Sequence, residues 1–154
     1  MTILIKNGRV LNPSENMDKV MDIYVRDGMI QERAENIQKN ADKVIDAKGC
    51  YVMPGLIDLH VHFRDPGLTY KEDIETGSRA AAKGGFTTVC CMPNTKPVVD
   101  SAETVKYIVD KSKEVGFTNV LPVGAVTMQM AGKETTDIEK LKAVSYTHLT
   151  LPTI

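Results

Sequence analysis

The chain has 154 residues, of which 42% are hydrophobic and 25% are charged, a balance typical of a globular protein with enough apolar material for a core. Its 19 basic and 20 acidic residues give a formal net charge of −1, so it lacks the basic patches that attract nucleic acids or anionic membranes. No apolar run reaches the about 20 residues needed to span a bilayer, and the amino terminus has no signal-peptide pattern. These features predict a cytoplasmic protein that binds neither nucleic acid nor membrane.

Residues 1–54 are typical of short β-strands joined by turns. The runs ILIKNGRVL, DIYVRDGMI and KVIDAKGCYV are rich in β-branched residues, and Asp27-Gly28 is a favoured two-residue hairpin turn. We therefore predict a small β-rich domain over residues 1–54.

From residue 55 the pattern changes to apolar runs that alternate with amphipathic helices. LIDLHVHF, FTTVCCM and NVLPVGAV begin near positions 56, 86 and 119. Such alternation indicates βαβ units and a parallel sheet, so residues 55–144 are predicted to be three βα units of an α/β fold.

Capping motifs predict where the three helices begin and end. The predicted starts are Thr69 with Glu72, Asp100 with Glu103, and Thr136 with Glu139. Glycines predict the ends of the first two helices, at Gly84-Gly85 and at Gly116.

Residues 145–154, SYTHLTLPTI, do not continue the alternation. This stretch is hydroxyl-rich, follows the third helix almost at once, and resembles a translated sequencing adapter. We interpret residues 145–154 as a non-native tail and therefore exclude His148 from the candidate site.

The stretch DLHVHFRDPG, residues 58–67, carries the strongest chemical signal. Side chains alternate between the two faces of a strand, so Asp58, His60, His62 and Arg64 are predicted to point the same way. Two imidazoles at i and i+2 can bind one metal ion, and the planar guanidinium of the arginine suits a carboxylate. The preceding apolar residues predict a buried strand, where such groups are costly unless a metal and an anion pair with them. Asp58 is either a partner that orients a histidine or a turn acceptor.

The three cysteines show neither a disulfide pattern nor zinc-finger spacing. Cys90 and Cys91 lie in a predicted strand, where adjacent residues face opposite sides, so we expect both to pack in the core.

PGLIDLHVHFRDPG resembles the metal-binding strand of the amidohydrolase superfamily, and its FRDPG continuation is similar to dihydroorotases of the longer bacterial type. CMPNTKPVVD, residues 91–100, resembles the MPNT segment of the same family. The resemblance covers roughly residues 3–143. It implies a (β/α)8 TIM-type barrel, of which residues 55–144 are the first three βα units, preceded by part of a small β-sandwich in residues 1–54.

The resemblance also implies a function and a set of site residues. His60 and His62 would bind zinc, of which a complete site holds two ions, while Arg64 and Asn94 would bind the substrate's carboxylate. The implied reaction is the reversible cyclisation of N-carbamoyl-L-aspartate to dihydroorotate in pyrimidine biosynthesis, with a bound metal ion stabilising the developing oxyanion. A homodimer or an association with another enzyme of the pathway stays open.

The chain also departs from the resemblance. The acidic or modified-lysine ligand, two further histidines and the catalytic aspartate of the family are not recognisable, so this chain contains no residue assigned to the catalytic acid or base and is expected to be inactive alone. The alternatives are another cyclic amidohydrolase, such as a hydantoinase or allantoinase, a non-catalytic dihydroorotase-like subunit, and a truncated product without a function of its own.

Overall fold

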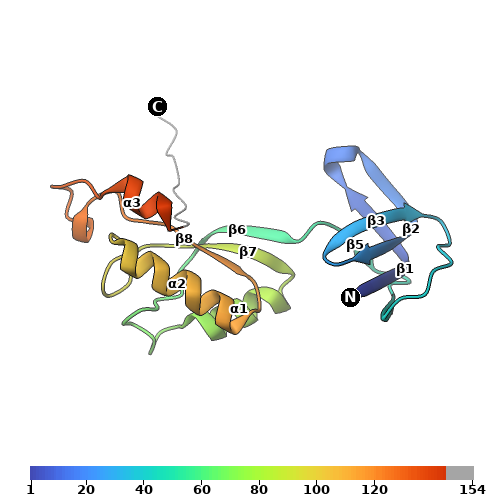
Figure 1. Ribbon diagram of the computed structural model, residues 1–154, viewed down its shortest axis with the longest axis horizontal. Helices are drawn as coiled ribbons and strands as arrows, with labels where there is room; N and C mark the ends of the chain where they lie inside the picture. Colours follow the sequence, from blue (N-terminus) through green and yellow to red (C-terminus); the bar gives the residue numbers. More distant parts are fainter. Residues whose placement is uncertain (145–154) are drawn as a thin grey trace. The chain divides into compact units, whose positions relative to one another are not determined.

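The computed structural model describes residues 1–144, which fall into two compact units that divide between Pro54 and Gly55 (Figure 1). The suspected non-native tail and His148 lie outside the described residues. Within residues 1–144, no helix is both long enough and apolar enough to cross a membrane.

The first unit is a five-stranded sheet. Its strands are β1 (Thr2–Asn12), β2 (Met17–Arg26), β3 (Met29–Ala34), β4 (Lys43–Asp46) and β5 (Tyr51–Val52), and a short 3-10 helix, η1 (Pro13–Glu15), joins β1 to β2. The order is β3-β2-β1-β4, with β5 also pairing with β1; β1, β2 and β3 are antiparallel neighbours, whereas β4 and β5 run parallel to β1. The predicted hairpin turn at Asp27-Gly28 is confirmed, because both residues have the positive φ that such a turn requires.

One buried carboxylate stabilises the irregular part of this sheet. The pairing of β1 with β2 shifts register between Ile5 and Gly8, and Asn7 within this bulge has a φ of 62°. Asp22 on β2 is 3% exposed and accepts hydrogen bonds from the backbone N–H groups of Asn7, at 2.8 Å, and Ile37, at 2.9 Å. The carboxylate thus satisfies two backbone donors that no strand partner reaches.

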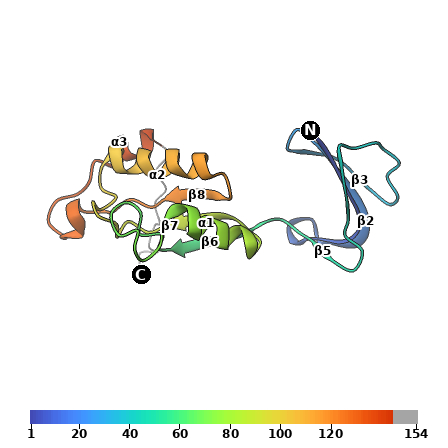
Figure 2. The ribbon, with the colours of Figure 1, turned by 90° about the horizontal axis from the view of Figure 1, so that it is seen from below.

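The second unit is a parallel sheet with helical crossovers. It contains β6 (Leu56–Val61), α1 (Ile74–Lys83), β7 (Phe86–Cys91), α2 (Ala102–Val115), β8 (Asn119–Pro122), the 3-10 helix η2 (Met128–Met130) and α3 (Ile138–Ala143). The order β6-β7-β8 and the parallel pairing confirm the predicted succession of βα units. In Figure 2, α2 runs alongside β8, with which it makes contact.

The main core lies between this sheet and its helices. It contains Val89 and Cys91 of β7 and Val120 of β8, together with Ile74 of α1 and two residues of α2, Val105 and Ile108. The other side of β7 contributes to a separate small cluster of Cys90, Met92 and Val123. Both cysteines are therefore buried, as predicted, and they belong to different clusters.

The helix ends are confirmed, but the predicted starts are wrong by one to four residues. Gly84 follows α1 and Gly116, with a φ of 66°, follows α2. The amino-terminal cap of α1 is Asp73 instead of Thr69, because the Asp73 carboxylate accepts a 2.7 Å hydrogen bond from the Thr76 N–H.

At the other two helices the cap is one residue later than predicted. Ser101 caps α2 and Asp137 caps α3. The predicted caps bond elsewhere: Asp100 accepts from the Gln129 N–H at 2.7 Å, and the Thr136 hydroxyl donates to the Ala125 carbonyl at 2.8 Å. The sequence cannot show which of two adjacent residues caps a helix when one of them forms a hydrogen bond with a loop instead.

Candidate metal centre

The candidate residues follow two adjacent parallel strands. His60 lies in β6 and His62 directly after it, while Asn94 comes three residues after β7. The backbone N–H of Met92 donates to the Val61 carbonyl at 2.9 Å, so the two segments of backbone stay paired past the end of β7. Because parallel strands end at the same edge of a sheet, all these groups lie at its carboxyl edge, where barrel enzymes place their sites.

The structure corrects two expectations about β6. This strand has one neighbour among the described residues, so Ile57 and Leu59 are 61% and 59% exposed, and the strand is not buried. Its pairing with β7 also shifts register between Asp58 and Val61. The strict alternation that was to place four polar side chains on one face is therefore interrupted.

The two histidine rings have the spacing that a shared metal ion requires. Their centroids are 5.0 Å apart, with an angle of 70° between the ring planes. Two imidazoles that bind one zinc ion tetrahedrally, with Zn–N bonds of about 2.0–2.1 Å, have centroids about 5 Å apart. Both side chains are exposed, so an ion can approach them. The separation of the two rings is therefore one that two ligands of a single zinc ion can have.

The remaining ligands are not found near this pair. In residues 1–144, no three side chains of histidine, cysteine, aspartate or glutamate are grouped so that they could hold a metal ion. A four-coordinate site that included this pair would need ligands from outside residues 1–144.

Asn94 contacts His62 directly. The side-chain oxygen of Asn94 lies 2.8 Å from Nδ1 of His62. The sequence predicts that both residues follow neighbouring strands, but nothing in their spacing indicates this hydrogen bond. An unbonded His62 ring could rotate about its side-chain torsions, whereas the bonded ring has a fixed direction.

Arg64 begins the turn that leads away from the histidines. Its φ of 61° lies in the left-handed region, so it does not continue the extended strand, and its carbonyl accepts from the Leu68 N–H at 2.9 Å. Within residues 1–144 its guanidinium forms no ion pair. Arg64 is half-buried, and in this part of the chain its guanidinium is free of protein carboxylates.

Gly67 lets this turn lie against the loop that carries Asn94. A Cβ atom at Gly67, whose φ is 87°, would lie 1.8 Å from the carbonyl oxygen of Lys96. The Lys96 N–H donates to the Pro66 carbonyl at 3.0 Å. The chain turns at Asp65-Pro66-Gly67, and the glycine of this turn serves a close approach between loops as well as the reversal.

A buried carboxylate ties the same turn to the helices. Asp65 is 4% exposed and accepts a hydrogen bond from the Tyr107 hydroxyl of α2 at 2.9 Å. Burial, and then this bond to the carboxylate, raise the pKa of Tyr107 above its ordinary value. The sequence did not single out this pair, because residues 42 positions apart show no local signal.

The Asp58 side chain accepts a hydrogen bond from the backbone. Its carboxylate accepts from the backbone N–H of His60 at 3.0 Å. Of the two roles that the sequence left open, the turn acceptor is therefore the one that the structure contains.

Burial raises the pKa of the Cys91 thiol to about 11, so this residue stays protonated and unreactive at neutral pH.

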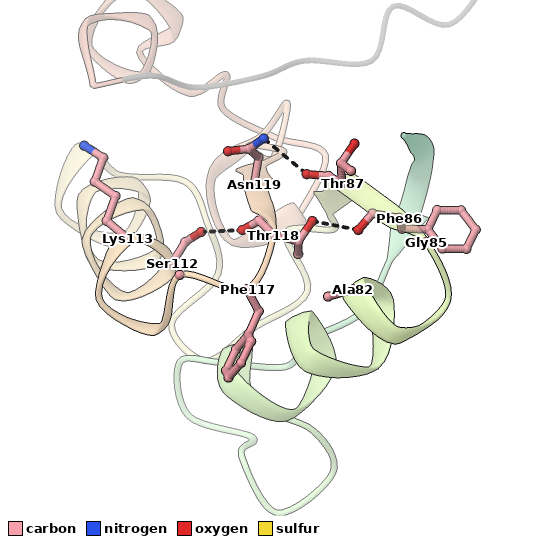
Figure 3. A pocket seen from close by; sticks show the side chains of 10 residues that line it. Ala82, Gly85, Phe86, Thr87, Ser112, Lys113, Phe117, Thr118 and Asn119 are labelled. Carbon is pink, nitrogen blue, oxygen red and sulfur yellow. Dashed lines mark hydrogen bonds between the residues drawn. The ribbon is translucent and has the colours of Figure 1, made fainter. Parts of the chain in front are cut away.

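A cavity of about 510 Å³ lies at the opposite, amino-terminal ends of β7 and β8 (Figure 3). Its polar side chains bond to neighbouring backbone: the Thr118 hydroxyl to the Phe86 carbonyl at 3.1 Å, and the Asn119 amide to the Thr87 carbonyl at 3.1 Å. These groups connect β7 to β8. This end of a barrel sheet is typically devoted to stability.

Comparison with solved structures defines the class of protein. The L-hydantoinase of Arthrobacter aurescens superimposes with a TM-score of 0.77 over 97% of this chain and 34% of that one, at 26% identity. A D-hydantoinase superimposes with a TM-score of 0.66 over 94% of this chain and 30% of that one, at 31% identity. The fold, with a His-x-His pair at the end of the first parallel strand, is that of the amidohydrolase barrels.

Sequence comparison narrows this class to one family. The family model described as Dihydro-orotase-like matches residues 49–151, and the chain belongs to that family. It is 53% identical over 142 residues to the dihydroorotase of Ruminiclostridium cellulolyticum and 51% identical over 142 residues to that of Aquifex aeolicus, in each case over 92% of this chain. The aligned region is 33% and 34% of those proteins, so the chain spans about a third of the curated relatives it matches.

Proposed function

We propose that this chain supplies the first metal ligands and the carboxylate-binding groups of a dihydroorotase, which cyclises N-carbamoyl-L-aspartate to dihydroorotate reversibly in pyrimidine biosynthesis. The observation that carries the proposal is the His60–His62 pair, whose rings are 5.0 Å apart at the carboxyl edge of the sheet in a member of this family.

Each residue has a role that its chemistry suits. His60 and His62 hold one zinc ion, and a complete site holds two. When bound, zinc polarises the ring carbonyl and stabilises the charge that develops on its oxygen. Arg64 binds the substrate's carboxylate through two parallel hydrogen bonds, and the amide NH2 of Asn94 donates a further bond to that carboxylate.

The two units have separate contributions. We propose that residues 55–144 are the first three βα units of the barrel and that residues 1–54 are part of a β-sandwich. A hollow of about 310 Å³ on the first sheet is lined by apolar side chains, including Ile30, which is 58% exposed, and Met53, which is 51% exposed. A second sheet packed on this face would bury them.

Zinc binding by the chain tests the metal assignment. Competition with a chromophoric chelator measures the zinc affinity of the wild-type chain and of His60→Ala, His62→Ala and His148→Ala. The first two variants are expected to lose at least tenfold in affinity, whereas His148→Ala, the matched control, keeps it. Equal affinities in all four proteins would overturn the proposal and would favour a dihydroorotase-like subunit that needs no metal.

The superposition on hydantoinases favours a second candidate, a cyclic amidohydrolase that acts on a ring without a carboxylate. The two candidates differ at Arg64. In a protein that carries this chain at the full length of its relatives, Arg64→Ala is expected to abolish hydrolysis of dihydroorotate and to spare that of an uncharged ring. If Arg64→Ala leaves activity on dihydroorotate intact, the carboxylate role of Arg64 is wrong. A wild-type protein that hydrolyses the uncharged ring but not dihydroorotate would replace the first candidate with the second.

A further inference from the structure

The bond between His62 and Asn94 has a defined direction. An amide oxygen accepts hydrogen bonds and cannot donate, so a hydrogen bond at this 2.8 Å contact requires the proton to lie on Nδ1 of His62. The second ring nitrogen, Nε2, then keeps its lone pair, which is the form that binds a metal ion.

The loop that carries Asn94 is held in place from both sides. Thr95 is 6% exposed, and its hydroxyl donates to the Pro97 carbonyl at 2.5 Å. The Lys96 N–H reaches the turn after His62 through the Pro66 carbonyl at 3.0 Å. Asn94 therefore stands at a fixed distance from the histidine strand without relying on its own side-chain bond.

His60 shows the contrast within the same motif. Its backbone N–H is bonded to Asp58, and the hydrogen bonds found in residues 1–144 include none to its ring. Among residues 1–144 the two histidines are thus not equivalent, since in this part of the chain only His62 has a protein group that selects which nitrogen carries the proton.

We propose that Asn94 is a positioning residue that fixes His62 in the Nδ1-protonated tautomer and directs Nε2 to the metal. The same bond fixes the amide of Asn94, because its oxygen is committed to His62 and its NH2 remains to donate to an anionic substrate. One residue thereby couples a metal ligand to the substrate's carboxylate. The metal-directing part of this inference rests on the proposed function, whereas the tautomer does not.

The tautomer can be measured directly on the metal-free chain. Long-range ¹H–¹⁵N spectra, recorded above the pH at which imidazole protonates, distinguish Nδ1–H from Nε2–H, and the His62→Gln variant assigns the signal. Asn94→Ala removes the acceptor, and Asn94→Asp is the matched control because a carboxylate accepts the same bond. Zinc affinity is measured for the same proteins.

The wild-type chain and Asn94→Asp are expected to carry the His62 proton on Nδ1. Asn94→Ala is expected to move it to Nε2, the tautomer that free histidine favours, and to weaken zinc binding by about tenfold or more. The His60 signals should stay unchanged in every variant. Loss of a purely structural side chain would not exchange the protonated nitrogen while leaving His60 unaltered.

Two results would overturn the inference: a wild-type His62 protonated on Nε2, or an Asn94→Ala chain with the same tautomer as the wild type. Neither result decides whether His60 and His62 bind zinc, which the zinc affinities of the histidine variants test separately. Conversely, if His60→Ala and His62→Ala do not alter zinc affinity, the proposed function fails, while the metal-free spectra still decide the role of Asn94.

Discussion

Substitution of Gly67 by alanine tests how the two site loops are held together. The new Cβ would lie 1.8 Å from the Lys96 carbonyl oxygen, and because real Cβ contacts are essentially never below 3.0 Å, the loops must separate by more than an ångström. The left-handed φ of 87° costs alanine about 1–2 kcal/mol, and loss of the Lys96-to-Pro66 bond costs about 1 kcal/mol more. We expect Gly67→Ala to lower the free energy of unfolding by about 2–3 kcal/mol.

The same separation should affect the metal centre. The 2.8 Å bond between His62 and Asn94 does not survive a displacement larger than an ångström, so zinc binding should weaken together with stability. Gly132→Ala is the matched control, because Gly132 has a φ of 71° but nothing within 4 Å of the place that a Cβ would take. It should show only the conformational cost of about 1–2 kcal/mol.

Urea denaturation followed by circular dichroism gives the free energies, and zinc titration gives the affinities. If Gly67→Ala and Gly132→Ala have the same stability and the same zinc affinity, the close approach of the two loops does not hold the site together, and the reasoning is refuted.

Two further predictions concern ionisable groups, of which Cys50 lies in the first unit and the others in the second. Cys50 is exposed, whereas burial raises the pKa of Cys91 to about 11. A thiol reagent at pH 8 should therefore modify Cys50 rapidly and Cys91 only when the chain unfolds. Rapid reaction of Cys91 in the folded chain would contradict its burial. The Thr76 N–H and hydroxyl lower the pKa of Asp73 below its ordinary 3.8, so the cap stabilises α1 above that pH and loses its effect as the pH falls through the lowered value. Asp73→Ala should cost about 1 kcal/mol at pH 7 and progressively less in acid, and a cost independent of pH would exclude the charged cap.

The sequence predicts the elements of this fold well because their signals are local. The hairpin turn, the parallel strands and the glycines that end the first two helices each depend on a few adjacent residues, and all are confirmed. The exposure of β6 was not predictable, since its apolar residues require a neighbour on both sides, and the described chain supplies one.

The site is less predictable than the strands that carry it. His60, His62 and Arg64 stand out because their spacing is local, yet the alternation that was to align them fails at the bulge after Asp58 and at the positive φ of Arg64. The contacts between His62 and Asn94 and between Tyr107 and Asp65 join residues more than 30 positions apart. Such contacts follow from the packing of loops, which no pattern of residue types encodes.

The side chains on the two faces of β7 belong to two separate apolar clusters. Cys91 packs among the helices, whereas Cys90 and Met92 pack on the other face, along the segment that continues to Asn94. A change of volume at Met92 is therefore expected to act on the cluster of Cys90 and Val123, and a change at Cys91 on the core that the helices cover. Two adjacent residues thus belong to apolar clusters that can be repacked separately.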